Sequence, residues 1–208
     1  VGIRTIDVSG GVLRLNNEPL YLRGLHAHGD APLRGRGHDD VHNVRDVQSA
    51  IAANANWLRI HPPPSEALLD LLDESGILVS AEVPAIGFRS APYDPHCSVP
   101  PQKNCDAFSP TRINATTLVN HKRYVSEYIS RDKNRACVLL WSVANEPAVE
   151  EVGSEPYFHS LLNASRTIDP QRRPMTYVTN RDVTNDLAAK HVDLICANRY
   201  FGWYTDGG

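Results

Sequence analysis

Short apolar segments alternate with helical segments along most of this 208-residue chain, and that alternation constrains its fold more than any other feature. Six segments have the length and the apolar, β-branched composition of buried strands. They cover residues 20–25, 57–60, 77–82, 137–144, 175–179 and 192–197. Strands and helices that alternate in this way predict right-handed βαβ units, which build a parallel sheet.

The ends of these strands help to separate the two architectures that such a sheet can adopt. A dinucleotide-binding, doubly wound sheet carries a G-x-G-x-x-G turn after its first strand, and this sequence lacks it. Polar residues instead end nearly every strand, as in barrels whose active sites draw on many strand ends. These residues are His28, Arg59, Glu82, Glu146, Asn180 and Asn198. We therefore predict an α/β fold of the (β/α)8 TIM-barrel type. A complete barrel needs roughly 250 residues, so about six of its eight βα units are expected here.

Local signals predict the first turns and the helices. Residues 3–25 alternate apolar and polar positions around two turn signals, which predicts a hairpin that leads into a strand. Asp39 or Asp40 can cap one helix, and Ser65 and Gly76 can bound the next. Helices are expected over residues 41–51, 65–76, 116–131 and 157–168.

Charge and sequons bear on partners and compartment. A formal net charge of -3 argues against a general nucleic-acid or membrane-surface binder. No apolar run reaches the length of about 18 residues that a membrane span requires. Asn114 and Asn163 each begin an N-x-S/T sequon, the pattern of a glycosylated lysosomal or secreted protein, although chance sequons are common. A bacterial protein would be cytoplasmic.

The four cysteines have no metal-binding spacing such as C-x-x-C, so no metal site is predicted. Cys97 and Cys105 lie in a long proline-rich loop, residues 84–110, where a disulfide between them is one alternative. Cys137 and Cys196 lie inside apolar strands and are expected to be buried thiols.

Glu146 follows the longest apolar strand, next to Asn145. Its plainest interpretation is a carboxylate in the first turn of a helix, where backbone N–H groups satisfy it. The alternative is catalytic, because an acid at the edge of an apolar wall has its neutral form favoured and can donate a proton to a leaving oxygen. The strand-end position favours the catalytic interpretation, since parallel barrels carry their active sites there.

The stretch 132–147, which ends in Trp-Ser-Val-Ala-Asn-Glu-Pro, resembles the acid/base segment of the glycoside hydrolases that include β-galactosidase, β-mannosidase and β-glucuronidase. The resemblance implies that Glu146 is the general acid/base and that Asn145 contacts a sugar hydroxyl. A retaining glycosidase also needs a second carboxylate roughly 5–5.5 Å away as its nucleophile. In the family a Glu at the end of the seventh strand takes that role, so the nucleophile is expected to be absent from this chain. Glu82 is expected to have a structural, site-shaping role.

The run 196–204 is the second specific match. By itself it would be a strand end with aromatic packing. It resembles β-glucuronidases closely, and the resemblance implies that Tyr200 orients the nucleophile, with Asn198 and Tyr204 near the substrate carboxylate. This run favours a glucuronide over a galactoside.

The loop 28–37 resembles the family's His-Glu-Asp-Ala-Asp-Leu-Arg-Gly-Lys-Gly, with Gly and Pro replacing two acidic residues. In register with that motif, His28 and Asp30 are implied as sugar-subsite residues. Arg59 matches the start of the family's Arg-Thr-Ser-His-Tyr-Pro segment, whereas the residues after it depart from that segment.

The resemblance as a whole predicts a fragment of a retaining glycoside hydrolase that cleaves β-D-glucuronides, including glycosaminoglycan ends, from non-reducing ends and without a cofactor. Residues 1–15 resemble the end of an immunoglobulin-like β domain with the hairpin into the barrel, and residues 16–208 resemble the partial catalytic barrel. The isolated fragment is expected to be inactive, and the parent protein to be a homo-oligomer. Two alternatives stay open: a galactosidase- or mannosidase-like hydrolase of the same clan, and a catalytically silent carbohydrate-binding barrel.

Overall fold

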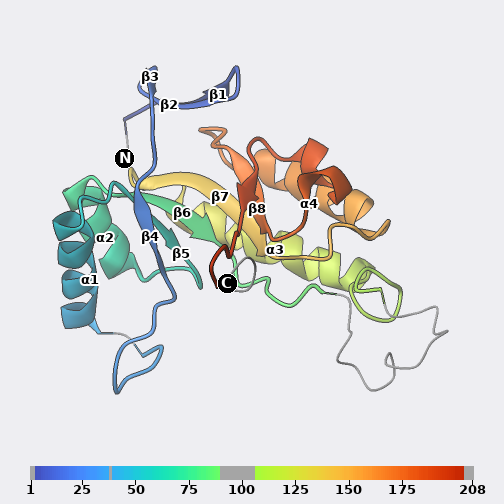
Figure 1. The fold of residues 1–208 in the computed structure, drawn as a ribbon, viewed down its shortest axis with the longest axis horizontal. Helices are drawn as coiled ribbons and strands as arrows, with labels where there is room; N and C mark the ends of the chain where they lie inside the picture. Colours follow the sequence, from blue (N-terminus) through green and yellow to red (C-terminus); the bar gives the residue numbers. More distant parts are fainter. Residues whose placement is uncertain (1–2, 38, 90–105, 204–208) are drawn as a thin grey trace.

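A six-stranded parallel sheet forms the centre of the computed structural model, which describes residues 3–37, 39–89 and 106–203 (Figure 1). Its strands lie side by side in the order in which they occur in the sequence. They are β4 (Gly24–Ala27), β5 (Trp57–Ile60), β6 (Leu78–Glu82), β7 (Val138–Asn145), β8 (Met175–Thr179) and β9 (Cys196–Ala197). A doubly wound sheet would reverse its order at a switch point. The uninterrupted order therefore confirms the prediction of an incomplete barrel.

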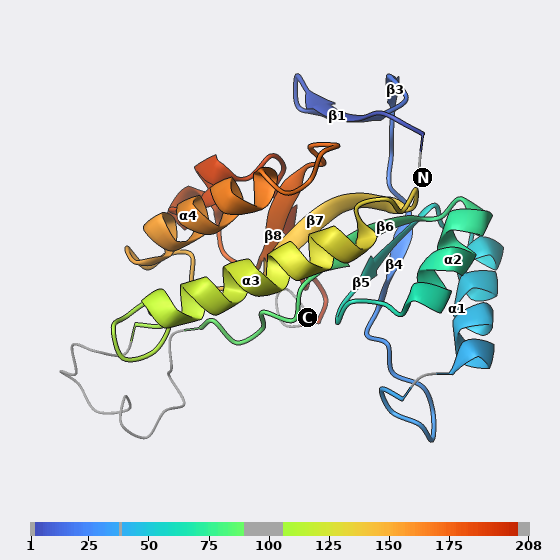
Figure 2. The same cartoon turned by 180° about the vertical axis from the view of Figure 1, so that it is seen from behind.

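The helices cover one face of this sheet, the outer face of the partial barrel (Figure 2). One α-helix follows each of the first four strands, and two short 3-10 helices lie between β8 and β9. Leu69, Ile129 and Phe158 are fully buried where these helices pack against the strands. The helices are α1 (Asp40–Ala52), α2 (Glu66–Ser75), α3 (Ala115–Asp132), α4 (Ser154–Arg166), η1 (Val183–Asn185) and η2 (Ala189–His191). Among the described residues, no helix is long and apolar enough to cross a bilayer.

The predicted helix boundaries have visible causes. The Asp39 carboxylate accepts from His42 N at 3.1 Å and starts α1, and the Ser65 hydroxyl accepts from Leu68 N at 3.2 Å and starts α2. Gly76 ends α2 at φ +68°, a left-handed conformation that glycine adopts without strain. These caps confirm the predicted ends of both helices.

The predicted first strand lies too early in the chain. The structure places β4 at Gly24–Ala27 rather than at residues 20–25. The side chain of Asn56 accepts from Arg23 N at 2.8 Å and donates to Tyr21 O at 2.9 Å, so a side chain takes backbone groups that a strand ladder would otherwise use. At Gly24 the backbone comes so close to Trp57 that an added Cβ would lie 2.2 Å from its carbonyl oxygen.

The predicted last strand is shortened for a similar reason. Only Cys196–Ala197 pairs with β8, instead of residues 192–197. The Asp193 carboxylate accepts from Met175 N at 2.8 Å, and the Thr176 hydroxyl donates to Leu194 O at 2.8 Å. Side chains therefore replace part of the expected ladder, an exchange that apolar periodicity does not reveal.

A small antiparallel sheet precedes the barrel and confirms the predicted hairpin. It consists of β1 (Ile6–Ser9), β2 (Val12–Leu15) and β3 (Glu18–Pro19), in that order. Leu13 and Leu15 pack with Leu78 and Leu140, at the end of the partial barrel where its strands begin. Figure 1 shows the small sheet beyond that end. The assignment of residues 1–15 to an immunoglobulin-like domain stays a prediction.

A buried histidine links α3 to β7 and predicts acid sensitivity. His121 is 7% exposed; its Nε2–H donates to Val143 O at 2.8 Å, so its Nδ1 accepts from the Tyr157 hydroxyl at 3.0 Å. Burial lowers the pKa of His121 from 6.5 to about 4, while the bond to Val143 opposes that shift. Between about pH 6.5 and pH 4, His121 therefore binds a proton in the unfolded chain but stays neutral in the folded chain. We expect this site to reduce the free energy of unfolding by about 3 kcal/mol as the pH falls through that window.

The measurement compares wild type with His121→Gln in the full-length protein. Urea unfolding is followed by tryptophan fluorescence at several pH values, because the difference between the two proteins isolates this one side chain. Wild type is expected to lose more stability than the variant between pH 6.5 and pH 4. A constant difference across that range would contradict the assignment.

Candidate active site

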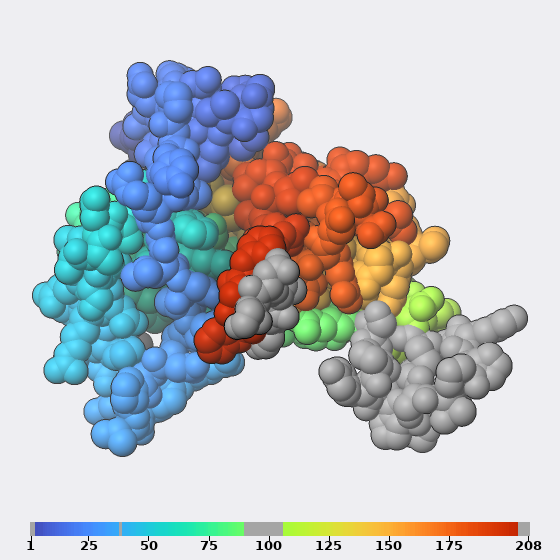
Figure 3. Space-filling view, viewed as in Figure 1, coloured from blue at the N-terminus to red at the C-terminus, as the bar shows by residue number. Residues whose placement is uncertain are grey.

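Inward-pointing side chains meet at the carboxyl ends of the parallel strands. Arg59, Glu82 and Ser142 line a cavity of about 360 Å³ inside the partial barrel, together with Asn198 at the end of β9. Figure 3 shows the segment around residue 200, in red, lying across the middle of the face that is turned toward the viewer. Three of the predicted strand-end residues, Arg59, Glu82 and Asn198, are thus gathered in one place, as a barrel requires.

Arg59 is the centre of a buried hydrogen-bond network. Its Nε and Nη2 donate to the two oxygens of Glu82 at 3.1 and 2.8 Å, a bidentate ion pair. Nη2 also donates to Asn145 Oδ1 at 2.6 Å, and Nη1 to Asn198 Oδ1 at 3.0 Å. The Arg59 side chain therefore holds the ends of four different strands in register.

Glu82 has no exposed surface, and both oxygens of its carboxylate accept hydrogen bonds. Besides Arg59, the Ser142 hydroxyl donates to Glu82 Oε2 at 2.7 Å. Burial raises the pKa of Glu82, and the hydrogen bonds from Arg59 and Ser142 oppose that rise. A carboxylate that accepts from both Arg59 and Ser142 holds the Arg59 side chain in place, which supports the structural interpretation of Glu82.

Glu146 sits directly after β7 and is only 5% exposed. Asn198 Nδ2 donates to its Oε1 at 2.7 Å, and the Tyr200 hydroxyl donates to the same oxygen. Arg89 forms an ion pair with Oε2. The carboxylate is thus fixed by three donors from two separate segments of the chain.

The backbone at Glu146 is unusual as well. Its φ is +48°, in the left-handed region that costs a non-glycine residue roughly 1–2 kcal/mol. The amide N–H of Glu146 donates to Val178 O at 2.7 Å and ties the residue to β8. Strained conformations that the surrounding structure maintains are concentrated at functional sites. The strain therefore adds weight to the catalytic interpretation.

Two expectations about Glu146 are wrong. It does not lie in the first turn of a helix, because α4 begins only at Ser154. Its carboxyl group also has three polar partners, Arg89, Asn198 and Tyr200, where the sequence predicted the edge of an apolar wall. The sequence singled out Asn198 and Tyr200 but not their bonds to Glu146, and it did not single out Arg89, because these contacts join distant segments of the chain.

The structure brings most predicted site residues together and separates a few. Arg59, Asn145, Asn198 and Tyr200 all belong to the network that reaches Glu146. Asp30 lies outside it and pairs on the surface with Arg36 at 3.2 Å. His28 instead packs against His26 and His61, at centroid distances of 4.2 and 4.6 Å. Tyr204 lies outside the described residues.

Three contributors to the site were not predicted. Ser142 carried a weak signal, a polar residue inside an apolar strand. Arg89 lies in the proline-rich loop, where no periodicity marks a functional position. His26 lies in β4 and His28 directly follows that strand, a spacing of two that the sequence does contain.

The other predicted sites are partly described. Cys137 is a buried free thiol, as expected, whereas the free thiol Cys196 is only half-buried, and Cys97 and Cys105 lie outside the described residues. Asn163 is exposed on α4, so an attached glycan would face solvent. Asn114 caps α3 by accepting from the amides of Thr116 and Thr117. Glycosylation at both sequons stays a prediction.

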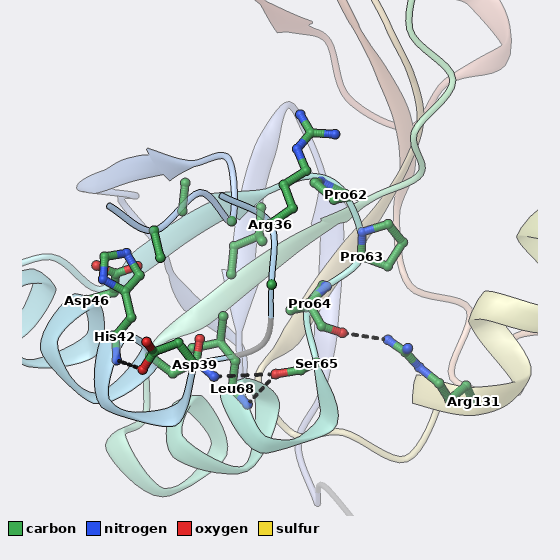
Figure 4. Close-up of a pocket in the computed structure, with 16 residues that line it drawn as sticks. Arg36, Asp39, His42, Asp46, Pro62, Pro63, Pro64, Ser65, Leu68 and Arg131 are labelled. Carbon is green, nitrogen blue, oxygen red and sulfur yellow. Dashed lines mark hydrogen bonds and ion pairs between the residues drawn. The ribbon is translucent and has the colours of Figure 1, made fainter. Parts of the chain in front are cut away.

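A second cavity, of about 300 Å³, lies beside the starts of α1 and α2 (Figure 4). Its polar groups are used structurally: Asp39 and Ser65 cap the two helices, and Arg131 donates to Pro64 O at 3.0 Å. No residue of the Glu146 network lines it. The candidate chemistry therefore belongs to the barrel interior rather than to this cavity.

A parallel partial barrel with a buried, anchored Glu at the end of its fourth strand matches a known family. Residues 6–208 match the family described as "Glycosyl hydrolases family 2, TIM barrel domain". The chain belongs to that family.

Individual relatives narrow the comparison. The chain is 40% identical over 209 residues to a β-glucuronidase of Paenibacillus borealis, covering 100% of the chain and 33% of that protein. It matches the structure of a β-D-glucuronidase from Dictyoglomus thermophilum with a TM-score of 0.89 and 39% identity, over 100% of the chain and 34% of that structure. It also matches a Bifidobacterium dentium β-glucuronidase complexed with coumarin-3-O-glucuronide, with a TM-score of 0.86 and 34% identity, over 100% of the chain and 31% of that structure. The chain thus spans about a third of the length of each.

Proposed function

We propose that the protein carrying this chain is a retaining β-glucuronidase and that Glu146 is its general acid/base. The observation that carries the proposal is the buried Glu146 carboxylate at the end of β7, fixed by Asn198 and Tyr200. The relatives named β-glucuronidase support it, and so does one relative's complex with a glucuronide.

In the proposed mechanism Glu146 acts twice. Its protonated form first donates a proton to the glycosidic oxygen, so that the aglycone leaves as a neutral alcohol. A second carboxylate, which we place outside residues 1–208, attacks the anomeric carbon from the opposite face and forms a glycosyl-enzyme intermediate. Glu146 then removes a proton from water as that water hydrolyses the intermediate. Two carboxylates suffice for this double displacement, so no cofactor takes part.

The surrounding residues position the sugar and the acid. Asn145 and Asn198 lie on either side of the Arg59 guanidinium, each within hydrogen-bond distance of it. Amide groups held in this way offer fixed partners for sugar hydroxyls and for the glucuronide carboxylate. The Tyr200 hydroxyl donates to Glu146, and we also assign to Tyr200 the orientation of the nucleophile, as the resemblance to the family implies.

A substrate panel tests the proposal in the full-length protein. We expect 4-nitrophenyl β-D-glucuronide to be hydrolysed with a kcat/KM at least about 100-fold above those of the matching galactoside and mannoside, because unpaired polar partners penalise the wrong sugar. Preference for a galactoside or mannoside would overturn the substrate assignment. Hydrolysis of none of the three would favour a silent carbohydrate-binding barrel.

The proposal extends to the compartment and the oligomeric state of the protein that carries this chain. The exposed Asn163 suits a glycosylated lysosomal or secreted protein, whereas a protein from a bacterium would be cytoplasmic. The homo-oligomer also stays a prediction.

A further inference from the structure

We propose that His26, His28 and His61 form a binding site for one divalent transition-metal ion of the zinc type. One nitrogen of each ring lies within 4.8 Å of the corresponding nitrogens of the other two. The ring centroids are 4.2, 4.7 and 4.6 Å apart. The proposed metal site does not rest on the proposed glucuronidase activity, although His26 also lines the barrel cavity.

The register of two strands places the three rings together. His26 pairs with Arg59 across β4 and β5, so the two side chains share the inner face of the sheet. His28 and His61 each lie two residues further along their own chain segments and follow the same alternation. The fold therefore brings the histidines to one level at the barrel mouth.

An unpaired nitrogen points to a missing ligand. His61 is 4% exposed, and its Nδ1 is buried without a hydrogen-bond partner among the described residues. Buried polar atoms are nearly always paired, and an orphan calls for an explanation such as an ion. A metal ion among the three rings would supply a partner for the histidine cluster.

Arg59 pairs with His26 across β4 and β5, so its positive charge lies close to the cluster. That charge would repel an ion, but the bidentate pairing of Arg59 with Glu82 offsets it.

The donor set favours zinc-like ions over calcium or magnesium. Three imidazoles and no carboxylate make a borderline-soft site, whereas Ca²⁺ and Mg²⁺ prefer oxygen ligands. Tetrahedral coordination with Zn–N bonds of about 2.0–2.1 Å places nitrogens about 3.3 Å apart. The three nitrogens lie within 4.8 Å of one another, so each distance must shorten by about 1.5 Å at most. His26 and His28 are exposed, which leaves a fourth position open to water or another ligand.

The test uses the full-length protein, stripped with a chelator and dialysed. Co²⁺ is titrated while the visible absorption of tetrahedral cobalt is recorded, and Zn²⁺ is titrated in competition with a chromophoric chelator. We expect one ion per chain. Substitution of residues that only hydrogen-bond to a metal ligand typically lowers the metal affinity about 10–100-fold. Loss of a ligand itself, in His26→Asn or His61→Asn, should therefore lower the affinity at least about 100-fold.

The matched control is His159→Asn. His159 stacks on His191 at 4.5 Å, and among the described residues no third histidine joins this pair, so its loss should leave the affinity and the cobalt spectrum unchanged. Circular dichroism checks the folding of each variant, and the exposed His28→Asn replaces His61→Asn if that protein does not fold. The proposal fails if wild type binds no ion, or if folded cluster variants bind it as tightly as wild type.

Discussion

Glu146→Gln is expected to lower kcat/KM for an alkyl β-D-glucuronide by about 10²–10⁴-fold in the full-length protein, the usual contribution of a positioned general acid. Glutamine keeps nearly the shape of the side chain, and its amide oxygen can still accept from Asn198 and Tyr200. It cannot donate a carboxylic proton or take one from water. The measurement is steady-state kinetics on a simple alkyl glucuronide.

The leaving group separates this chemistry from a folding defect. A 2,4-dinitrophenyl aglycone leaves without protonation, so its kcat/KM should fall far less in the same variant. Glu150→Gln is the control, because Glu150 pairs with Arg181 outside the Glu146 network and should change neither substrate. Equal losses on both substrates would argue against a role for Glu146 as the acid.

Arg59→Met is expected to have the largest effect on stability. Removing one partner of a buried ion pair leaves the other charge uncompensated, at a cost of about 3–5 kcal/mol. In this variant the uncompensated charge would be the Glu82 carboxylate, which has no exposed surface. Its remaining hydrogen bond would be the one from the Ser142 hydroxyl. Chemical denaturation of the full-length protein measures the free energy of unfolding.

A double variant tests the cause of that loss. Arg59→Met combined with Glu82→Leu removes both charges, and apolar replacement of a buried pair is often neutral in stability. The double variant should therefore recover much of what the single variant loses. If the double variant were less stable than Arg59→Met alone, the buried Glu82 charge would not be the reason.

Much of the fold followed from local pattern. Alternating strands and helices, with polar residues at strand ends, predicted a partial barrel, and Ser65 and Gly76 marked both ends of α2. The pattern failed at the first and last strands, where Asn56 and Asp193 bond to backbone groups through their side chains. A side-chain bond that replaces a ladder bond leaves the apolar periodicity unchanged.

Most members of the candidate site were predictable, whereas the contacts between them were not. The resemblance marked Glu146 and Asn145 through one continuous motif. The bonds from Arg59 reach Asn145 and Asn198 across 86 and 139 residues, so they depend on the register of strands far apart in sequence. The histidine cluster was missed because it joins two separate segments, and only the pairing of β4 with β5 brings them together.

Azide rescue of Glu146→Ala tests the central claim most directly. Without the acid/base, water cannot be activated to hydrolyse the glycosyl-enzyme intermediate, whereas azide attacks it without needing a base. With 2,4-dinitrophenyl β-D-glucuronide as substrate, added azide should accelerate turnover of the full-length variant and yield β-glucuronosyl azide, the retained anomer. If Glu146→Ala hydrolysed this substrate at the wild-type rate and formed no glycosyl azide, Glu146 would not be the acid/base.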